Sequence, residues 1–434
     1  MIPQIVYRGL IYDLHGLRKA TLVIENGFIK ETLDPWENVS GEIVLDYRRD
    51  KNVIAFPGFI DIHVHLRDFK QSYKETIETG TKAALHGGIT VVGEMPNTVP
   101  RINNLSTLEK RIKILENNSY TDYYVYIDVP ENKLDVEQMI RNPIVMGIKL
   151  YPEKIGAPTL DYALEKLGKT NKILILHPEE QYMIDKYRTG LDEYYWFRDV
   201  RIETESIRHI SILNSKFNVK THITHITSYL SLLEAKRFGY TVDTCPHYLL
   251  LDYERFNAKN CYVKVLPPIR DHQNRALLYD LFVSGHIDVL ASDHAPHGVM
   301  EKMCCPKTCP PGINGVEVLS VFAGDLVSKG IISLDQMYRL LSYNPSRILG
   351  LRKYGVLCRG CRGNLSITRF NCKTRIKPEY IVSKAKYSVY DSWEFHSCVE
   401  ATIVGGELGF HRGKGFSRRL RGEAVGVVEG YSWI

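Results

Sequence analysis

The central part of the chain alternates between short apolar segments and longer segments with helical periodicity. The apolar segments, each of strand length, are 59–65, 89–95, 122–129, 144–151, 172–177, 219–226, 240–247 and 287–293. Segments of helical pattern, such as 73–88, 105–118 and 274–285, fill most of the intervals between them. Strands that alternate with helices form parallel sheets, and eight such units are typical of a closed barrel. We therefore predict an α/β fold with a TIM-type (β/α)8 barrel over residues 53–352.

A doubly wound open sheet is the main alternative for the same alternation of strands and helices. Such a sheet would require a glycine-rich phosphate loop directly after its first strand. The residues that follow 59–65 read LRDFKQS and contain no glycine. The sequence therefore favours the closed barrel.

The two ends of the chain have a different pattern, in which apolar and polar residues alternate over short runs. Examples are ATLVIENGFIKET near the N-terminus, with a turn at Asn26 and Gly27, and GNLSITRF near the C-terminus. Such runs are typical of antiparallel strands joined by tight turns. Because neither end has enough strands for a sheet of its own, we expect residues 1–52 and 353–434 to pair. Together they would form a small composite β-sandwich domain.

Composition and charge limit the classes of partner. The chain has 434 residues, of which 44% are hydrophobic, and a formal net charge of +6. This mild excess suits an anionic small molecule and is too weak to indicate nucleic acid, so we expect the basic run 410–422 to be a solvated turn and strand. No apolar run approaches the ~20 residues of a membrane helix, and MIPQIVYRGL lacks the organisation of a signal peptide. We therefore expect a cytoplasmic protein with neither a nucleic-acid nor a membrane partner.

The nine cysteines include a cluster at Cys304, Cys305 and Cys309 and a CxxC pair at Cys358 and Cys361. A zinc site built on the CxxC pair would require a second matching pair, and the sequence shows none. We therefore expect ordinary reduced thiols, as in most cytosolic proteins. Intracellular disulfides, as found in hyperthermophiles, are the alternative.

The segment FIDIHVHLRD (59–68) places two histidines at the end of the first apolar run. Side chains on a strand alternate between its faces, so His63 and His65 point the same way. Other predicted strands end in residues of the same kind, namely Lys149, His177, His225 and Asp293. Because the C-terminal ends of the strands of such a barrel meet at one mouth, we expect all six side chains to converge there. A single strand-end histidine is usually a hydrogen-bonded structural residue, but that explanation does not account for six convergent polar groups.

These residue types indicate a metal centre. Imidazole and carboxylate groups are ligands for zinc and similar divalent ions. The ammonium of Lys149 is not a ligand, but its neutral amine can add carbon dioxide and form a carbamate with two oxygen atoms. Two metals that share such a bridge and a hydroxide supply a nucleophile at neutral pH and a Lewis acid for a carbonyl oxygen.

Five short motifs resemble the cyclic amidohydrolases, a superfamily that includes dihydroorotases, hydantoinases and allantoinases. The motifs are HVH (63–65), KLY (149–151), HPE (177–179), HIT (225–227) and SDHAPH (292–297). Their order and spacing are similar to the superfamily pattern from about residue 53 to residue 350. The flanking strands resemble the small composite β-domain of the same superfamily.

The resemblance implies a centre of two zinc ions in each chain. The first ion would be held by His63, His65 and Asp293, and the second by His177 and His225. Carboxylated Lys149 would bridge the two ions. The family pattern places the ligand of the HITHIT stretch at its second histidine, so His222 would be structural.

Two further motifs, HLRD (65–68) and MPNT (95–98), resemble the dihydroorotases specifically. The guanidinium of Arg67 is a planar fork of donors that matches a carboxylate, and dihydroorotate carries one. The resemblance implies that Asn97 and His297 complete this carboxylate pocket. Leu266 stands where the family often has an asparagine, so a side-chain hydrogen bond to the substrate ring is lost there.

The resemblance implies the dihydroorotase reaction of pyrimidine (UMP) biosynthesis, the reversible cyclisation of N-carbamoyl-L-aspartate to L-dihydroorotate. In the hydrolytic direction a hydroxide held by both metals would attack the ring carbonyl. Asp293 would be the catalytic residue, because it takes the hydroxide proton and delivers it to the departing ring nitrogen.

Two alternatives to this function stay open. Another cyclic amidohydrolase, similar to a hydantoinase or allantoinase, would have other residues in place of Arg67 and Asn97. A non-catalytic partner of aspartate carbamoyltransferase would be expected to have lost metal ligands, and this chain keeps all six. The sequence does not exclude an active enzyme that also assembles with aspartate carbamoyltransferase, or a homo-oligomer.

Overall fold

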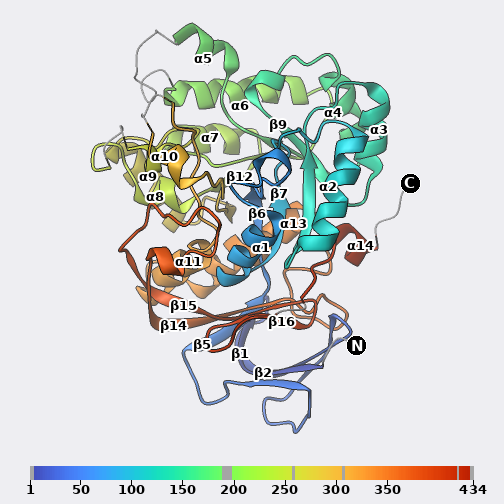
Figure 1. The fold of residues 1–434 in the computed structure, drawn as a ribbon, viewed down its shortest axis with the longest axis vertical. Coiled ribbons are helices and arrows are strands. Elements are labelled where there is room, and N and C mark those ends of the chain that lie inside the picture. Colours follow the sequence, from blue (N-terminus) through green and yellow to red (C-terminus); the bar gives the residue numbers. More distant parts are fainter. Residues whose placement is uncertain (1–3, 188–197, 257–259, 305–307, 418–419, 431–434) are drawn as a thin grey trace.

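The larger part of the molecule is a parallel eight-stranded sheet surrounded by helices (Figure 1). The computed structural model describes residues 4–187, 198–256, 260–304, 308–417 and 420–430. The strands, each paired in parallel with the next, are β6 (Phe59–Val64), β7 (Ile89–Glu94), β8 (Asp122–Ile127), β9 (Val145–Leu150), β10 (Ile173–Leu176), β11 (Thr221–Ile223), β12 (Thr241–Thr244) and β13 (Val289–Leu290). Each strand lies within one of the eight predicted segments.

The first and last strands of this sheet meet just beyond their ends. A parallel bridge joins Val64 to His294, and the His65 N–H donates to the His294 carbonyl oxygen at 2.8 Å. These contacts close the sheet into a barrel. The predicted (β/α)8 barrel is therefore confirmed, and the open doubly wound sheet is excluded.

Helices cover the outside of the barrel, and shorter helices lie within the loops that connect its strands. They are α1 (Ile77–His86), α2 (Leu105–Asn118), α3 (Lys133–Arg141), α4 (Leu160–Gly168), α5 (Gln181–Tyr187), α6 (Val200–Asn214), α7 (Tyr229–Arg237), α8 (Pro246–Leu250), α9 (His272–Val283), α10 (Val299–Lys302), α11 (Leu319–Ser328), α12 (Leu334–Tyr338), α13 (Asn344–Ile348) and α14 (Val425–Glu429). Side-chain caps fix where several of them begin: Thr76, Asn104 and Ser228 accept backbone N–H groups at the starts of α1, α2 and α7.

The barrel strands end earlier than the sequence pattern predicts. The segment 219–226 contains only three strand residues, and 287–293 contains two. His225 and Asp293 follow these strands with φ angles of 40° and 43°, in the left-handed region that non-glycine residues seldom adopt. The chain therefore leaves the hydrogen-bonded ladder before it places these side chains in the mouth.

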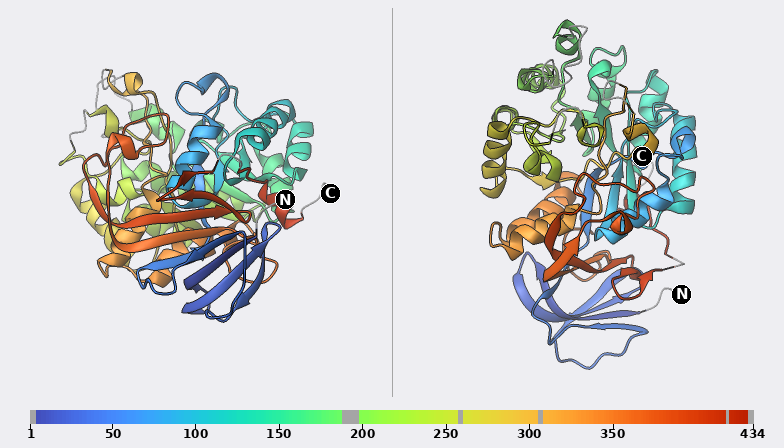
Figure 2. Two further views of the ribbon diagram at one scale, coloured as in Figure 1. Left: turned by 60° about the horizontal axis from the view of Figure 1, so that its bottom comes forward. Right: turned by 60° about the vertical axis from the view of Figure 1, so that its left-hand side comes forward.

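The two ends of the chain form a second sheet of nine strands, which lies beside the barrel (Figure 2). Its strands are β1 (Ile5–Asp13), β2 (Gly16–Glu25), β3 (Phe28–Leu33), β4 (Ile43–Asp46), β5 (Val53–Pro57), β14 (Leu365–Arg375), β15 (Glu394–Val404), β16 (Glu407–His411) and β17 (Gly415–Phe416). The N-terminal and C-terminal strands pair where β5 runs antiparallel to β14. The sheet curves around a core of its own, in which Leu22 of β2 and Ile403 of β15 belong to one apolar cluster.

A buried ion pair joins the C-terminal segment to the barrel. Asp122, at the start of β8, accepts two hydrogen bonds from the Arg362 guanidinium, at 3.0 and 3.1 Å. Its carboxylate also accepts from the Tyr354 hydroxyl, the Asn364 amide and the Glu423 backbone N–H. Asp122 is fully buried and Arg362 nearly so. Because water does not reach this pair, each charge is balanced by the opposite charge of its partner.

We expect Asp122→Ala to lower the free energy of unfolding by about 3–5 kcal/mol, because it leaves the buried Arg362 guanidinium with only the exposed Glu423 carboxylate as counter-ion. Chemical denaturation followed by circular dichroism measures this loss. Asp391→Ala, at an exposed position, is the matched control and should change stability little. Equal losses in the two variants would contradict the role of the ion pair.

A segment between β14 and β15 leaves the small sheet and packs on the barrel. The buried carboxylates of Glu75 and Glu317 accept the backbone N–H groups of residues 382–384. The Asn314 amide donates to the Tyr387 carbonyl oxygen. These contacts tie the loops before α1 and after β13, which reach the barrel mouth, to the small sheet.

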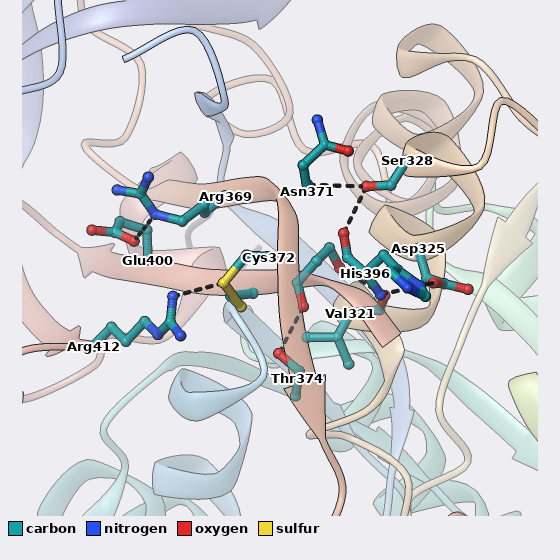
Figure 3. Close-up of a disulfide and its surroundings, with 12 residues drawn as sticks. Val321, Asp325, Ser328, Arg369, Asn371, Cys372, Thr374, His396, Glu400 and Arg412 are labelled. Carbon is teal, nitrogen blue, oxygen red and sulfur yellow. Dashed lines mark hydrogen bonds and ion pairs between the residues drawn. A yellow bond between two sulfur atoms is a disulfide. The ribbon is translucent and has the colours of Figure 1, made fainter. Parts of the chain in front are cut away.

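The expectation of reduced thiols is wrong for six of the nine cysteines. Disulfides join Cys261 to Cys309, Cys358 to Cys361 and Cys372 to Cys398. The last links β14 to β15 beside the Arg369–Glu400 ion pair, and Figure 3 shows its surroundings. Cys245 is a buried thiol that belongs to none of these disulfides, and Cys305 lies outside the described residues. Partners 48 residues apart, such as Cys261 and Cys309, have no local sequence signal.

The basic run 410–422 contains β17 and the exposed turn residues Gly413 and Lys414, as expected of a solvated turn and strand. Arg418 and Arg419 lie outside the described residues. Among the helices that the structure describes, none combines the length and the apolar character that a membrane span requires.

Candidate active site

A cavity of about 260 Å³ opens at the C-terminal ends of the barrel strands. All nine residues that the sequence predicts for the site line it, namely His63, His65, Arg67, Asn97, Lys149, His177, His225, Asp293 and His297. They come from the ends of six strands and the loops that follow them, namely β6, β7, β9, β10, β11 and β13. The convergence expected from the barrel is therefore present.

The first group of possible metal ligands comprises His63, His65 and Asp293. The Nε2 atoms of both histidines lie 3.2 Å from Oδ1 of Asp293. One ligand atom of each residue lies within 4.8 Å of the others, and all three residues are buried. This is the donor set and compactness that a divalent ion such as zinc requires.

Neighbouring side chains orient these ligands. His65 Nδ1 lies 2.6 Å from Oδ1 of Asn97, so Nδ1–H donates to the amide oxygen and the Nε2 lone pair faces Asp293. The Asp61 carboxylate accepts the backbone N–H groups of His63 and Ser292, which ties the two ligand-bearing segments together. Burial raises the pKa of Asp61 to about 7.

The second group comprises His177, His225 and Lys149. The ring centres of His177 and His225 lie 4.6 Å apart, and those of His63 and His225 lie 5.2 Å apart. His177 Nε2 donates to Glu179 at 2.8 Å, which leaves the Nδ1 lone pair available to a metal ion. The Asp243 carboxylate accepts the His225 backbone N–H at 2.6 Å.

Lys149 is fully buried at the end of β9, and its ammonium donates to Thr224 Oγ1 at 2.8 Å. Burial lowers the pKa of Lys149 to about 7, against the opposing effect of Asp243 and Asp293. The neutral amine, the form that can add carbon dioxide, is therefore well populated at neutral pH.

Two observations test whether the residues fit a bound metal. The buried Nδ1 atoms of His63 and His225 have no hydrogen-bond partner among the residues that the structure describes. Burial, with neighbouring positive charge, also holds the pKa of both histidines well below the usual value, so their lone pairs are unprotonated. Neutral imidazoles with unpartnered nitrogens fit a metal centre.

The other end of the cavity carries positive charge and hydrogen-bond donors. Arg67 Nε donates to the Pro296 carbonyl oxygen at 3.1 Å, and His297 Nε2 donates to the Pro311 carbonyl oxygen at 2.9 Å. Arg67 Nη2 lies 3.3 Å from His297 Nε2, whose proton Pro311 already accepts, so the guanidinium is the donor left for a bound carboxylate.

Arg67 reaches this position from a turn. Strand alternation would put it on the same face as His63 and His65 if the strand continued. The strand ends at Val64, and Arg67 has a φ angle of 57°. Arg111 holds the turn, because it donates to the Arg67 carbonyl oxygen at 3.0 Å and forms a buried ion pair with Glu94.

The cavity residues that the sequence analysis did not single out include Tyr151, Glu179 and Arg198. Tyr151 lies two residues after Lys149, so strand alternation could have indicated it. Its buried hydroxyl has no hydrogen-bond partner in the described part of the chain. Glu179 belongs to the HPE motif; burial opposes its charge, but Arg198 and His177 lower its pKa to about 2. Arg198 had no sequence signal.

His222 and Leu266 lie as the sequence suggests. His222 is buried inside the barrel, where its ring nitrogens contact Thr241 and Asp243, so it has the contacts of a structural residue. Leu266 lines the cavity with an apolar side chain.

We expect Asn97→Ala to weaken zinc binding about tenfold in the absence of substrate, because the Asn97 amide orients the ring of His65. His65→Ala should weaken it more, because it removes a ligand atom. Competition with a fluorescent chelator measures both affinities. Asn117→Ala, on the exposed face of α2, is the control. An unchanged affinity in Asn97→Ala would show that the amide does not position the ligand.

Comparison with known proteins gives a consistent result. Residues 54–120 match the model of the amidohydrolase family. The dihydroorotase of Sulfolobus acidocaldarius is 38% identical over 360 residues, which cover 82% of this chain and 84% of that protein. The dihydroorotase of Saccharolobus solfataricus is 36% identical over 86% of this chain and 88% of that protein.

Solved structures show the same fold at lower sequence identity. The L-hydantoinase of Arthrobacter aurescens superposes with a TM-score of 0.87 at 21% identity, over 96% of this chain and 98% of that one. A D-hydantoinase from a Thermus species superposes with a TM-score of 0.84 at 21% identity, over 97% of this chain and 99% of that one. At these identities the likeness concerns the fold. The identities to the archaeal proteins, over most of both chains, show that this chain belongs to the dihydroorotase family of amidohydrolases.

Proposed function

We propose that the protein is a dihydroorotase, a metal-dependent hydrolase that interconverts L-dihydroorotate and N-carbamoyl-L-aspartate by opening and closing a ring amide. The observation that carries this proposal is the pairing of two sites in one cavity. One end is lined by Arg67 and His297, which lie in contact, and the other holds six residues of metal-ligand type. A substrate with both a carboxylate and a hydrolysable amide fits this division.

The carboxylate end fixes how the substrate lies. Arg67 is almost fully buried, so little water competes with a carboxylate for its guanidinium. Hydrogen bonds to a charged group in such a site are strong and directional. A substrate held there by its carboxylate would present one ring carbonyl to the other end of the cavity, which reduces the entropy lost on reaching the reactive geometry.

The residues at the metal end fit two zinc ions. We propose His63, His65 and Asp293 for the first and His177 and His225 for the second. The neutral amine of Lys149, once converted to a carbamate, would bridge them. Bound zinc supplies a Lewis acid for a carbonyl oxygen and lowers the pKa of water.

Asp293 is the residue proposed to move the proton. Its carboxylate lies between the two histidines of the first group and lines the cavity. In the hydrolytic direction it takes a proton from the attacking water and delivers that proton to the ring nitrogen as the amide bond breaks. In the cyclising direction it takes the proton from that nitrogen.

A hydantoinase-like enzyme is the second candidate, supported by the shared fold alone. Its uncharged substrate would leave the Arg67 guanidinium buried without an anion at the end of the cavity, which is unfavourable. We also propose that the protein acts in pyrimidine synthesis in the cytoplasm and assembles with aspartate carbamoyltransferase.

The test of the proposed function compares two substrates that differ in one group. Wild-type holoenzyme should open L-dihydroorotate much faster than dihydrouracil, which lacks the carboxylate. We expect Arg67→Ala to lose a hundredfold or more in kcat/KM for dihydroorotate, at ~1.4 kcal/mol per factor of ten. Arg67→Lys should also fall well below wild type, because an ammonium cannot reproduce the planar fork.

Arg352→Ala, at an exposed position, is the control for this experiment, and zinc content should be equal in all variants. A wild type that prefers dihydrouracil, or an Arg67→Ala variant with full activity on dihydroorotate, would overturn the assignment.

The proposed carbamate predicts a chemical rescue. Lys149→Ala should be nearly inactive, because it removes the group that bridges the two metals. Short-chain carboxylates such as acetate should restore part of the activity, since they can supply two oxygen atoms in the same space. The exposed Lys110→Ala variant should keep the wild-type activity, and acetate should not increase that activity. Normal turnover by Lys149→Ala would disprove the bridge.

A further inference from the structure

Behind the carboxylate end of the cavity lies a buried lysine that the mechanism does not use. Lys74, in the loop before α1, is 7% exposed. Its Nζ lies 3.0 Å from His297 Nδ1 and 2.9 Å from the Glu301 carboxylate. Lys74 does not line the cavity, so it can influence a substrate only through His297.

We propose that Lys74 is a positioning residue that fixes which ring nitrogen of His297 carries the proton. This inference rests on the proposed function, because it concerns the pocket for the substrate carboxylate. By holding the proton on Nε2, where Pro311 accepts it, Lys74 keeps this nitrogen from accepting a hydrogen bond from Arg67, so the guanidinium stays free to donate to a bound carboxylate.

The hydrogen-bond partners of the His297 ring determine its tautomer. An ammonium can only donate, so Nδ1 must accept from Lys74. A neutral imidazole then carries its proton on Nε2, where the Pro311 carbonyl oxygen accepts it at 2.9 Å. Arg67 Nη2 approaches the same nitrogen at 3.3 Å, and it too is a donor. Because the protonated Nε2 cannot accept from Arg67, Nη2 is left to donate to an acceptor that comes from outside, which a carboxylate provides.

The ring stays neutral because of its surroundings. Burial, together with the charges of Arg67, Lys74 and Lys302, holds the pKa of His297 far below the usual value. Gly312 leaves the Nε2 edge of the ring accessible, since a Cβ at that position would lie 3.0 Å from His297 Nε2.

Glu301 has the opposite influence on the tautomer. Its Oε2 lies 3.8 Å from His297 Nδ1, on the same side as the Lys74 ammonium. Without Lys74, this carboxylate would attract the proton to Nδ1. The Nε2 lone pair would then accept from Arg67, so this guanidinium N–H would no longer be free to donate to a substrate carboxylate. Replacement of Lys74 should therefore raise KM more when Glu301 is present than when Glu301 has also been replaced.

The experiment measures kcat and KM for dihydroorotate with zinc-loaded full-length protein. We expect Lys74→Met to raise KM about tenfold or more, with a smaller fall in kcat, because a hydrogen bond to a charged group is lost. Lys70→Met, an exposed lysine of the same loop, should match wild type. Zinc content and melting temperature show whether each variant is folded and loaded.

The double variant separates a tautomer effect from a structural one. Glu301→Gln keeps an oxygen that can accept the Gly298 N–H, as Glu301 does, so α10 keeps its cap. Glu301→Gln alone should keep the wild-type KM, and Lys74→Met with Glu301→Gln should recover part of the KM lost in Lys74→Met. If the Lys74–Glu301 pair were only structural, Glu301→Gln would raise KM as much as Lys74→Met, and the double variant would show no recovery.

The outcomes distinguish this inference from the proposed function. A wild type that opens dihydroorotate, with an unchanged KM in Lys74→Met or no recovery in the double variant, overturns the role of Lys74 alone. If Lys74→Met fails to fold, a raised KM in Glu301→Gln overturns it. A wild type that does not open dihydroorotate overturns the proposed function, and the inference with it.

Discussion

The active site depends on two carboxylates buried inside the barrel, Asp61 and Asp243. They accept backbone N–H groups at the ends of three strands: Asp61 from His63 in β6 and from Ser292 after β13, and Asp243 from His225 after β11. A backbone that departs from the ladder loses its hydrogen-bond partners, and in a buried site each lost partner is costly. The two carboxylates replace those partners, which allows the ligand-bearing segments to adopt backbone conformations that the ladder would not permit.

The cavity separates two electrostatic environments over a short distance. At the metal end, burial keeps the imidazoles neutral and lowers the pKa of Lys149, so basic lone pairs are available there. At the other end Arg67 is buried, and Lys74 and Lys302 lie behind it. A substrate that carries its negative charge at one end and an amide at the other is bound in one orientation by this field. Orientation and chemistry are therefore set by the same distribution of charge.

The barrel and the nine site residues could be predicted because their signals are local. Apolar segments and strand-end residues such as His177 can be read within a few positions of each other. Contacts between distant segments could not be predicted. The Lys74–His297 contact spans 223 residues, and the Asn97–His65 bond depends on how two adjacent loops fold. The turn at Arg67 depends on Arg111, whose role appears only when α2 packs beside β6. The disulfides belong to the same class of non-local contacts.

The closure of the barrel between β6 and β13 has a consequence for how the protein acquires metal. His65 and Asp293 lie on either side of this seam, 228 residues apart in the sequence. During synthesis the first ligand group cannot exist until the last strand has emerged from the ribosome and docked against the first. An ion bound there would stabilise the closed barrel by mass action, since it would bind only when both sides of the seam are in contact. Metal loading would therefore report closure of the barrel, and a chain that ended before Asp293 would have no such site with which to capture the ion.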